Sequence, residues 1–172
     1  AGVLRLDALM RHLQESAALH AEDLDFGRGR LEALESYWVL SNMVIWVDRL
    51  PGWNGEYAIR TWPSGHSRIV ATREFEGFNA EGERLFQASS DWMVLDKARN
   101  RPRKLDKLEI GNLRTGSRLM GEKLARLDAC TDLQAIEEIR VPFSAIDLNG
   151  HVNNTEYVRW AMDALRLLEP EH

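Results

Sequence analysis

The sequence predicts an α+β fold in which one long amphipathic helix packs on an antiparallel sheet. The helix is expected over residues 5–24, where apolar residues recur every three or four positions. The sheet is expected because four β-type runs follow one another with only short turns between them, an order typical of antiparallel pairing. These runs are residues 37–47, 56–62, 67–78 and 85–95.

The predicted helix has one apolar face that needs a cover. Gly27 and Gly29 follow it and mark its end. Burial of five or six large side chains, at about 1.5–3 kcal/mol each, favours packing of this face on the sheet. The face consists of Leu6, Leu9, Met10, Leu13, Ala17, Ala21 and Leu24.

Turn-forming residues separate the four strands. They occur at residues 50–55 (LPGWNG), at Pro63-Ser64-Gly65 and at residues 79–83 (NAEGE), and the last of these predicts a hairpin. The succession predicts an antiparallel meander, in which each strand pairs with the next one along the chain.

Composition and charge exclude several function classes. The chain has 172 residues, is 44% hydrophobic and 28% charged, and is therefore globular in composition. Its 22 basic and 27 acidic residues give a net charge of −5, which argues against a nucleic-acid binder. Cys130 is the single cysteine, so an internal disulfide and a cysteine metal cluster are excluded. We expect a cytoplasmic protein, because no membrane span or secretion signal is visible.

The second half of the sequence predicts a linker followed by one strand and one helix. Residues 97–107 contain six basic residues and one acid, which is typical of a solvated segment. A short strand is expected at 138–143 and a helix at 152–168. The apolar stripe of that helix needs a cover, so we expect either a missing C-terminal segment or a partner chain. A homodimer therefore stays open. The stripe comprises Tyr157, Ala161, Ala164, Leu165 and Leu168.

The most informative stretch is residues 147–157, DLNGHVNNTEY. Asp, Asn and Gly form turns and cap helices, so this pattern alone is more often structural. His151 adds a functional interpretation, because an imidazole can activate water and N–H groups at a helix start can stabilise an oxyanion. With Asn149 and Asp147 nearby, these residue types suit thioester hydrolysis by water. Serine nucleophile chemistry has less support, because the chain has no G-x-S-x-G elbow.

Further motifs accompany this run over most of the chain. The second half has D-x-N-x-H-V-N-N-x-x-Y followed by Trp160. The first half has LMRHLQESAALHA, Trp46 with Arg49-Leu50-Pro51, Thr61-Trp62-Pro63, Gly82, Asp91-Trp92, Leu95-Asp96 and Arg101-Pro102. With these motifs the sequence resembles the fatty acyl-[acyl-carrier-protein] (acyl-ACP) thioesterases, of the 4-hydroxybenzoyl-CoA-thioesterase-like superfamily.

The resemblance implies a tandem hot-dog fold, in which each module is a long helix wrapped by an antiparallel sheet. The modules are then residues 1–97, which hold the acyl-chain pocket, and residues 137–172, the start of an incomplete second module with the catalytic motif. Residues 98–136 form the linker between them. A further acidic or cysteine element of the family follows this helix and has no counterpart in the chain.

The resemblance also assigns site residues and a substrate. Asp147, Asn149 and His151 match the family's catalytic aspartate, asparagine and histidine. The substrate is a fatty acyl chain on its carrier protein, with no metal and no cofactor. Substrate-binding positions are Asn153, Asn154, Trp46 and Trp62, and Met43, Ile45 and Trp92 are further candidates for the pocket lining. A basic cluster that could dock the acidic carrier protein comprises Arg99, Arg101, Arg103 and Lys104.

Two other functions remain open at this stage. An acyl-CoA thioesterase of the same fold would differ only in the carrier of the acyl chain. A non-catalytic module would bind acyl thioesters without turnover. A nucleic-acid-binding domain has little support, because no recognition fold accompanies the basic linker.

Overall fold

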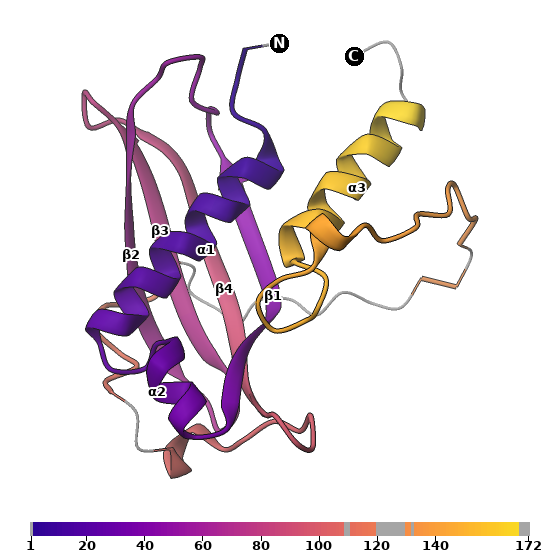
Figure 1. The fold of residues 1–172 in the computed structure, drawn as a ribbon. Coiled ribbons are helices and arrows are strands. Elements are labelled where there is room, and N and C mark those ends of the chain that lie inside the picture. Colours follow the sequence, from indigo (N-terminus) through magenta and orange to yellow (C-terminus); the bar gives the residue numbers. More distant parts are fainter. Residues whose placement is uncertain (1, 109–110, 120–129, 132, 169–172) are drawn as a thin grey trace.

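The computed structural model describes residues 2–108, 111–119, 130–131 and 133–168. The predicted helix is confirmed as α1, Leu6–Asp23, and it lies across one face of a four-stranded antiparallel sheet (Figure 1). Leu9 and Leu13 are fully buried on its sheet-facing side. The short helix α2, Arg28–Ala33, follows after Gly27 and packs on the first strand. The α+β class is therefore confirmed.

The sheet contains the four expected strands in a different order. They are β1 (Ser36–Val47), β2 (Tyr57–His66), β3 (Ala71–Asn79) and β4 (Arg84–Asp96), arranged β1-β4-β3-β2. Only β2, β3 and β4 form the predicted meander; the expected pairing of β1 with β2 is wrong. The connection between them, residues 48–56, instead crosses the end of the sheet to the opposite edge (Figure 1).

The predicted turn at residues 63–65 is also wrong, because β2 continues through it. Pro63 pairs with Arg73 and Gly65 with Thr72, so the register shifts by one residue between them. This bulge accommodates the proline, which cannot donate a ladder hydrogen bond. The turn occurs four residues later, where the N–H of Ser67 donates to the carbonyl of Val70 at 2.7 Å.

The chain after β4 packs on the first module more closely than a solvated linker does. Leu105, Leu108 and Leu113 are buried in one core cluster with Phe26 and Val94. A second cluster, around Leu9, Leu13, Phe75 and Phe86, lies under α1. The basic side chains of residues 97–107 nevertheless remain exposed, apart from the half-buried Arg103.

The expected C-terminal helix is confirmed as α3, Asn154–Leu168. It stands beside the β1 edge of the sheet and contacts α1 (Figure 1). The strand predicted at residues 138–143 is absent: residues 138–142 have no regular structure, and a short 3₁₀ turn spans Phe143–Ala145. A strand needs a neighbour to satisfy its backbone groups, and no described segment pairs with this one. Among the described helices, none is both long and apolar enough to cross a membrane.

Candidate active site

The motif run before α3 forms a tight loop that Asp147 organises. One carboxylate oxygen of Asp147, Oδ1, accepts the backbone N–H of Asn149 at 2.8 Å and that of His151 at 3.1 Å. The backbone N–H of Asp147 donates to the carbonyl of His151 at 2.7 Å. Gly150 has a φ of 77°, a conformation that glycine adopts without strain. Asp147 therefore fixes the backbone that presents the two other motif side chains.

The start of α3 is capped by its own chain. Asn153 Oδ1 accepts the N–H of Thr155 at 3.0 Å, and the Asn153 carbonyl accepts the N–H of Glu156 at 3.0 Å. N–H groups at the start of this helix were expected to be able to stabilise an oxyanion, but those of Thr155 and Glu156 are already hydrogen-bonded within the chain. Asn153 has the role of a helix cap in this structure.

His151 is exposed on the surface of this loop and lies against β1. Its ring centre is 5.6 Å from that of Tyr37, with the two planes inclined at 42°. The Tyr37 hydroxyl donates to Asn100 Oδ1 at 2.9 Å, in the turn that follows β4. Tyr37 therefore links the motif loop to the basic turn at the end of the sheet.

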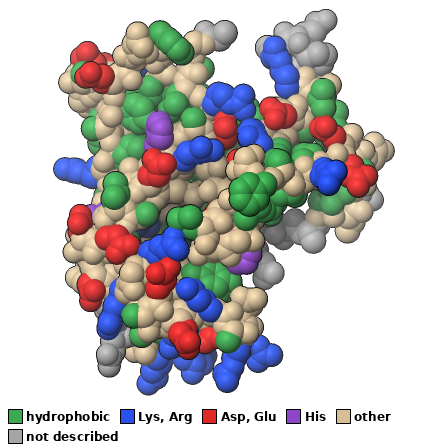
Figure 2. Space-filling view, viewed as in Figure 1, with side chains coloured by type: hydrophobic (Ala, Val, Ile, Leu, Met, Phe, Trp, Pro, Cys, Tyr) green, Lys and Arg blue, Asp and Glu red, His purple; other side chains and the backbone are tan. Residues whose placement is uncertain are grey.

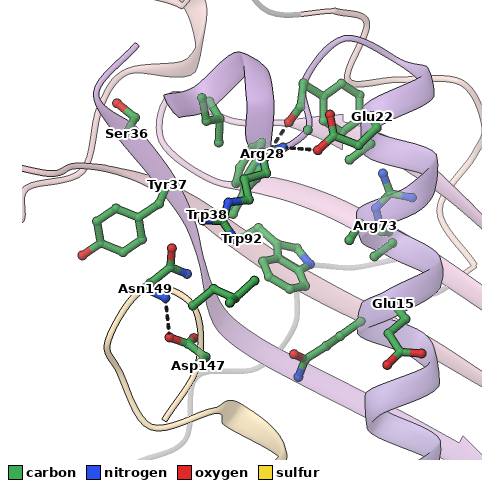
Figure 3. Close-up of a pocket in the computed structure, with 18 of the residues that line it drawn as sticks. Glu15, Glu22, Arg28, Ser36, Tyr37, Trp38, Arg73, Trp92, Asp147 and Asn149 are labelled. Atoms are coloured by element: carbon green, nitrogen blue, oxygen red, sulfur yellow. Dashed lines mark hydrogen bonds between the residues drawn. The ribbon is translucent and has the colours of Figure 1, made fainter. Parts of the chain in front are cut away.

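A cavity of about 620 Å³ opens beside the motif loop, between α1, β1 and the sheet (Figure 3). This volume lies within the range of small-molecule sites, about 300–1,000 Å³. Asp147 and Asn149 form part of one wall, and Trp38 and Trp92 form part of another. Small side chains of α1 leave room for the cavity: Ala17, Ala18 and Ala21.

The cavity contains some predicted site residues and not others. Asp147, Asn149 and Asn153 line it, as does the candidate Trp92. His151 lies next to it through Tyr37, which does line it. Two predicted substrate-binding tryptophans lie elsewhere: Trp46 is 46% exposed near the end of β1, and the Trp62 indole donates to the Ser117 carbonyl at 2.8 Å.

The other predicted positions are placed as follows. Asn154 is the first residue of α3 and half-buried. In the basic cluster, Arg99, Arg101 and Lys104 are exposed. Arg103 differs, because its guanidinium Nη1 donates to the Leu34 carbonyl at 2.7 Å and to Ser36 Oγ at 2.9 Å. Arg103 therefore joins the post-β4 segment to the start of β1.

Two charged residues in the cavity wall were missed by the sequence analysis. Glu156 is 4% exposed and pairs with Arg159 at 2.5 Å and Arg11 at 4.0 Å, which connects α3 to α1. Arg73 is 5% exposed and occupies an inward position of β3 between Ala71 and Phe75. The alternation of the strand could have revealed Arg73, because both neighbours two residues away are apolar and buried.

Arg73 and its neighbour His20 have shifted pKa values. Burial lowers the pKa of Arg73 to about 10, so its guanidinium stays protonated at neutral pH. Burial, and then the charge of Arg73, lower the pKa of the neighbouring His20. Within the described residues, no three His, Cys, Asp or Glu side chains gather as a metal site would require.

Comparison with known families matches both halves of the chain to one family. The sequence model of the acyl-ACP thioesterase N-terminal domain matches residues 1–110, and that of the C-terminal domain matches residues 129–168. A palmitoyl-acyl carrier protein thioesterase of Gossypium hirsutum is 29% identical over 94% of this chain and 43% of its own length. A dodecanoyl-[acyl-carrier-protein] hydrolase of Cinnamomum camphora is 26% identical over 92% of this chain and 45% of its own length. The chain thus spans less than half of these curated relatives.

Solved structures show the same fold. An acyl-ACP thioesterase from Bacteroides thetaiotaomicron superposes with a TM-score of 0.82 at 27% identity, over 94% of this chain and 66% of that one. The 12:0-ACP thioesterase from Umbellularia californica superposes with a TM-score of 0.71 at 23% identity, over 95% of this chain and 68% of that one. The helix wrapped by an antiparallel sheet is therefore shared with these structures.

Proposed function

Because the chain belongs to the acyl-ACP thioesterase family, we propose that the protein hydrolyses fatty acyl-ACP to a free fatty acid and the carrier protein. One observation carries the proposal: a cavity of about 620 Å³ has the motif residues Asp147 and Asn149 in its wall. An acyl chain can lie among the apolar side chains while its thioester faces the motif loop. The proposal includes two modules joined by residues 98–136.

The loop geometry supports a division of labour among the motif residues. Asn149 faces the cavity and binds the thioester carbonyl or the attacking water through its side-chain amide. His151 orients this water and removes its proton as the C–O bond forms. The C–S bond then breaks, and the departing thiolate of the carrier takes up the proton that His151 removed from the water. Asp147 is a positioning residue, because its carboxylate holds the N–H groups of Asn149 and His151.

The exposed basic cluster, Arg99, Arg101 and Lys104, supports docking of an acidic carrier protein. Basic side chains gather at the end of the molecule where β4 ends (Figure 2). Lys97, which begins this turn, also lines the cavity. A carrier bound at the turn could therefore insert its acyl arm beside Tyr37. Arg103 contributes less, because its guanidinium bonds within the fold.

The reaction is tested by measuring thiol release from one acyl chain carried by ACP and by CoA, with the full-length protein. We expect a higher kcat/KM for acyl-ACP. In Asn149→Ala we expect kcat to fall by about 10²–10³-fold, the effect typical of losing an oxyanion donor. Preference for acyl-CoA would favour the alternative acyl-CoA thioesterase. Binding of acyl-ACP without turnover would instead indicate a non-catalytic module.

Docking is tested separately by charge reversal. Arg99→Glu and Arg101→Glu should raise KM for acyl-ACP, since each brings a like charge to the acidic carrier, and should leave KM for acyl-CoA unchanged. Arg60→Glu, an exposed arginine on β2, is the matched control. An unchanged KM for acyl-ACP in a folded double variant would refute docking at this turn. A cytoplasmic location stays a prediction; the two curated relatives named above are chloroplastic.

A further inference from the structure

The wall of the proposed acyl cavity contains a buried arginine. Arg73 points from β3 into the space under α1 (Figure 3). Its guanidinium carbon is 5.8 Å from the centre of the Phe26 ring. Ala71, Trp38 and Trp92 line the same cavity. A saturated acyl chain in this cavity would offer the Arg73 guanidinium no hydrogen-bond acceptor.

The hydrogen bonds of Arg73 leave one end of its guanidinium without a partner. Nη1 donates to Thr61 Oγ1 at 3.1 Å and lies 3.0 Å from His20 Nδ1. Nη2 is buried and has no hydrogen-bond partner. No carboxylate of the described residues forms an ion pair with Arg73. A buried donor of this kind is costly unless something accepts its hydrogen bond.

The positive charge of the Arg73 guanidinium further favours a ligand that accepts a hydrogen bond. The guanidinium remains protonated at neutral pH although burial lowers its pKa to about 10. Both of its hydrogen-bonded neighbours are uncharged when His20 is neutral, and the lowered pKa of His20 favours that state. A ligand oxygen would therefore meet a full positive charge on a buried group, where the hydrogen bond is stronger than in water.

We propose that Arg73 binds an oxygen on the acyl group, so that this protein takes acyl chains with a hydroxyl, keto or carboxylate oxygen. The inference rests on the proposed function, because it places the acyl chain in this cavity. In Figure 3 the Trp92 indole lies between Arg73 and the loop of Asp147 and Asn149. The oxygen therefore belongs to the distal part of the chain, away from the thioester.

The test compares acyl-ACP substrates of equal length, saturated or carrying a terminal hydroxyl, over a graded series of lengths with the full-length protein. At the length that reaches Arg73, the hydroxylated chain should have a kcat/KM at least about tenfold higher, as expected for a hydrogen bond to a charged group. Arg73→Met keeps the bulk but removes the donors, and it should abolish this preference. Arg60→Met, on an exposed position of β2, should preserve it.

The outcomes separate this inference from the proposed function. If the wild type hydrolyses saturated chains as well as hydroxylated ones at every length, or if Arg73→Met keeps the wild-type ratio, the inference fails and the thioesterase stands. If no acyl-ACP is hydrolysed, the proposed function fails. Binding of terminal-hydroxy and saturated acyl-ACP to the wild type, by calorimetry, then decides the inference: equal affinities at every length overturn it. Should Arg73→Met not fold, Arg73→Lys replaces it and should retain part of the preference.

Discussion

Replacement of Asp147 by alanine should reduce turnover strongly without unfolding the protein. The change removes the acceptor of two backbone hydrogen bonds, from Asn149 at 2.8 Å and from His151 at 3.1 Å. At about 0.5–1.5 kcal/mol each, the loop loses about 2 kcal/mol of ordering. Since about 1.4 kcal/mol corresponds to a factor of ten, kcat should fall about 30-fold. The melting temperature should change little, because the loop is largely exposed and outside both core clusters.

The amide variant decides whether Asp147 acts by position or by charge. Asp147→Asn retains an Oδ1 acceptor, so it should recover most of the lost kcat, with KM close to that of the wild type. Steady-state hydrolysis of acyl-ACP and a thermal melt are measured for both variants. Asp163→Ala, on the exposed face of α3, is the control. The positioning role is refuted if Asp147→Asn is as inactive as Asp147→Ala, or if Asp147→Ala retains full activity.

Two further predictions concern stability. Gly77→Ala places a Cβ 2.1 Å from the buried Phe86 ring, so overpacking should lower the free energy of unfolding by about 1–3 kcal/mol. Gly29→Ala in α2 meets no close atom, so this variant should be as stable as the wild type or more stable. Equal melting temperatures for the two variants would contradict the packing of β3 on β4. The lowered pKa of His20, caused by burial and then by Arg73, means that the unfolded chain binds the proton more readily. The free energy of unfolding should therefore decline as pH falls below about 6.5, the ordinary pKa of histidine. In His20→Gln this decline, measured as the urea midpoint at each pH, should be smaller. Identical pH dependence in the two proteins would exclude His20 as its source.

Local sequence patterns predicted the elements of the fold better than their arrangement. Helix α1 was found because the spacing of Leu9, Leu13 and Ala17 records burial of one face. The order of the strands was not predicted correctly, because a run of β-type residues carries no information on which strand it pairs with. The long connection of residues 48–56 reads as a turn, yet it crosses the end of the sheet. Pro63-Ser64-Gly65 predicts a turn, although here it forms a bulge inside a strand, because turns and bulges use the same residue types.

The motif loop was predictable, whereas the cavity was not. Asp147, Asn149 and Gly150 are turn-forming residues, and the loop they form is local in sequence. The cavity combines side chains from α1, β1, β3 and β4, so its shape depends on tertiary packing. Trp46 and Trp62 illustrate the difference: a tryptophan on a strand fits either face, and both lie outside the cavity. Arg73 is the exception, because its place between Ala71 and Phe75 in the alternation of β3 predicts an inward position.

Single-turnover hydrolysis of acyl-ACP tests whether the loop before α3 acts on the acyl thioester through His151. The wild-type full-length protein should release the carrier thiol. His151→Ala should bind the substrate with similar affinity, retain its melting temperature and release the thiol at least about 10²-fold more slowly, the usual contribution of a general base. Release at the wild-type rate by a folded His151→Ala variant would show that His151 is not the general base.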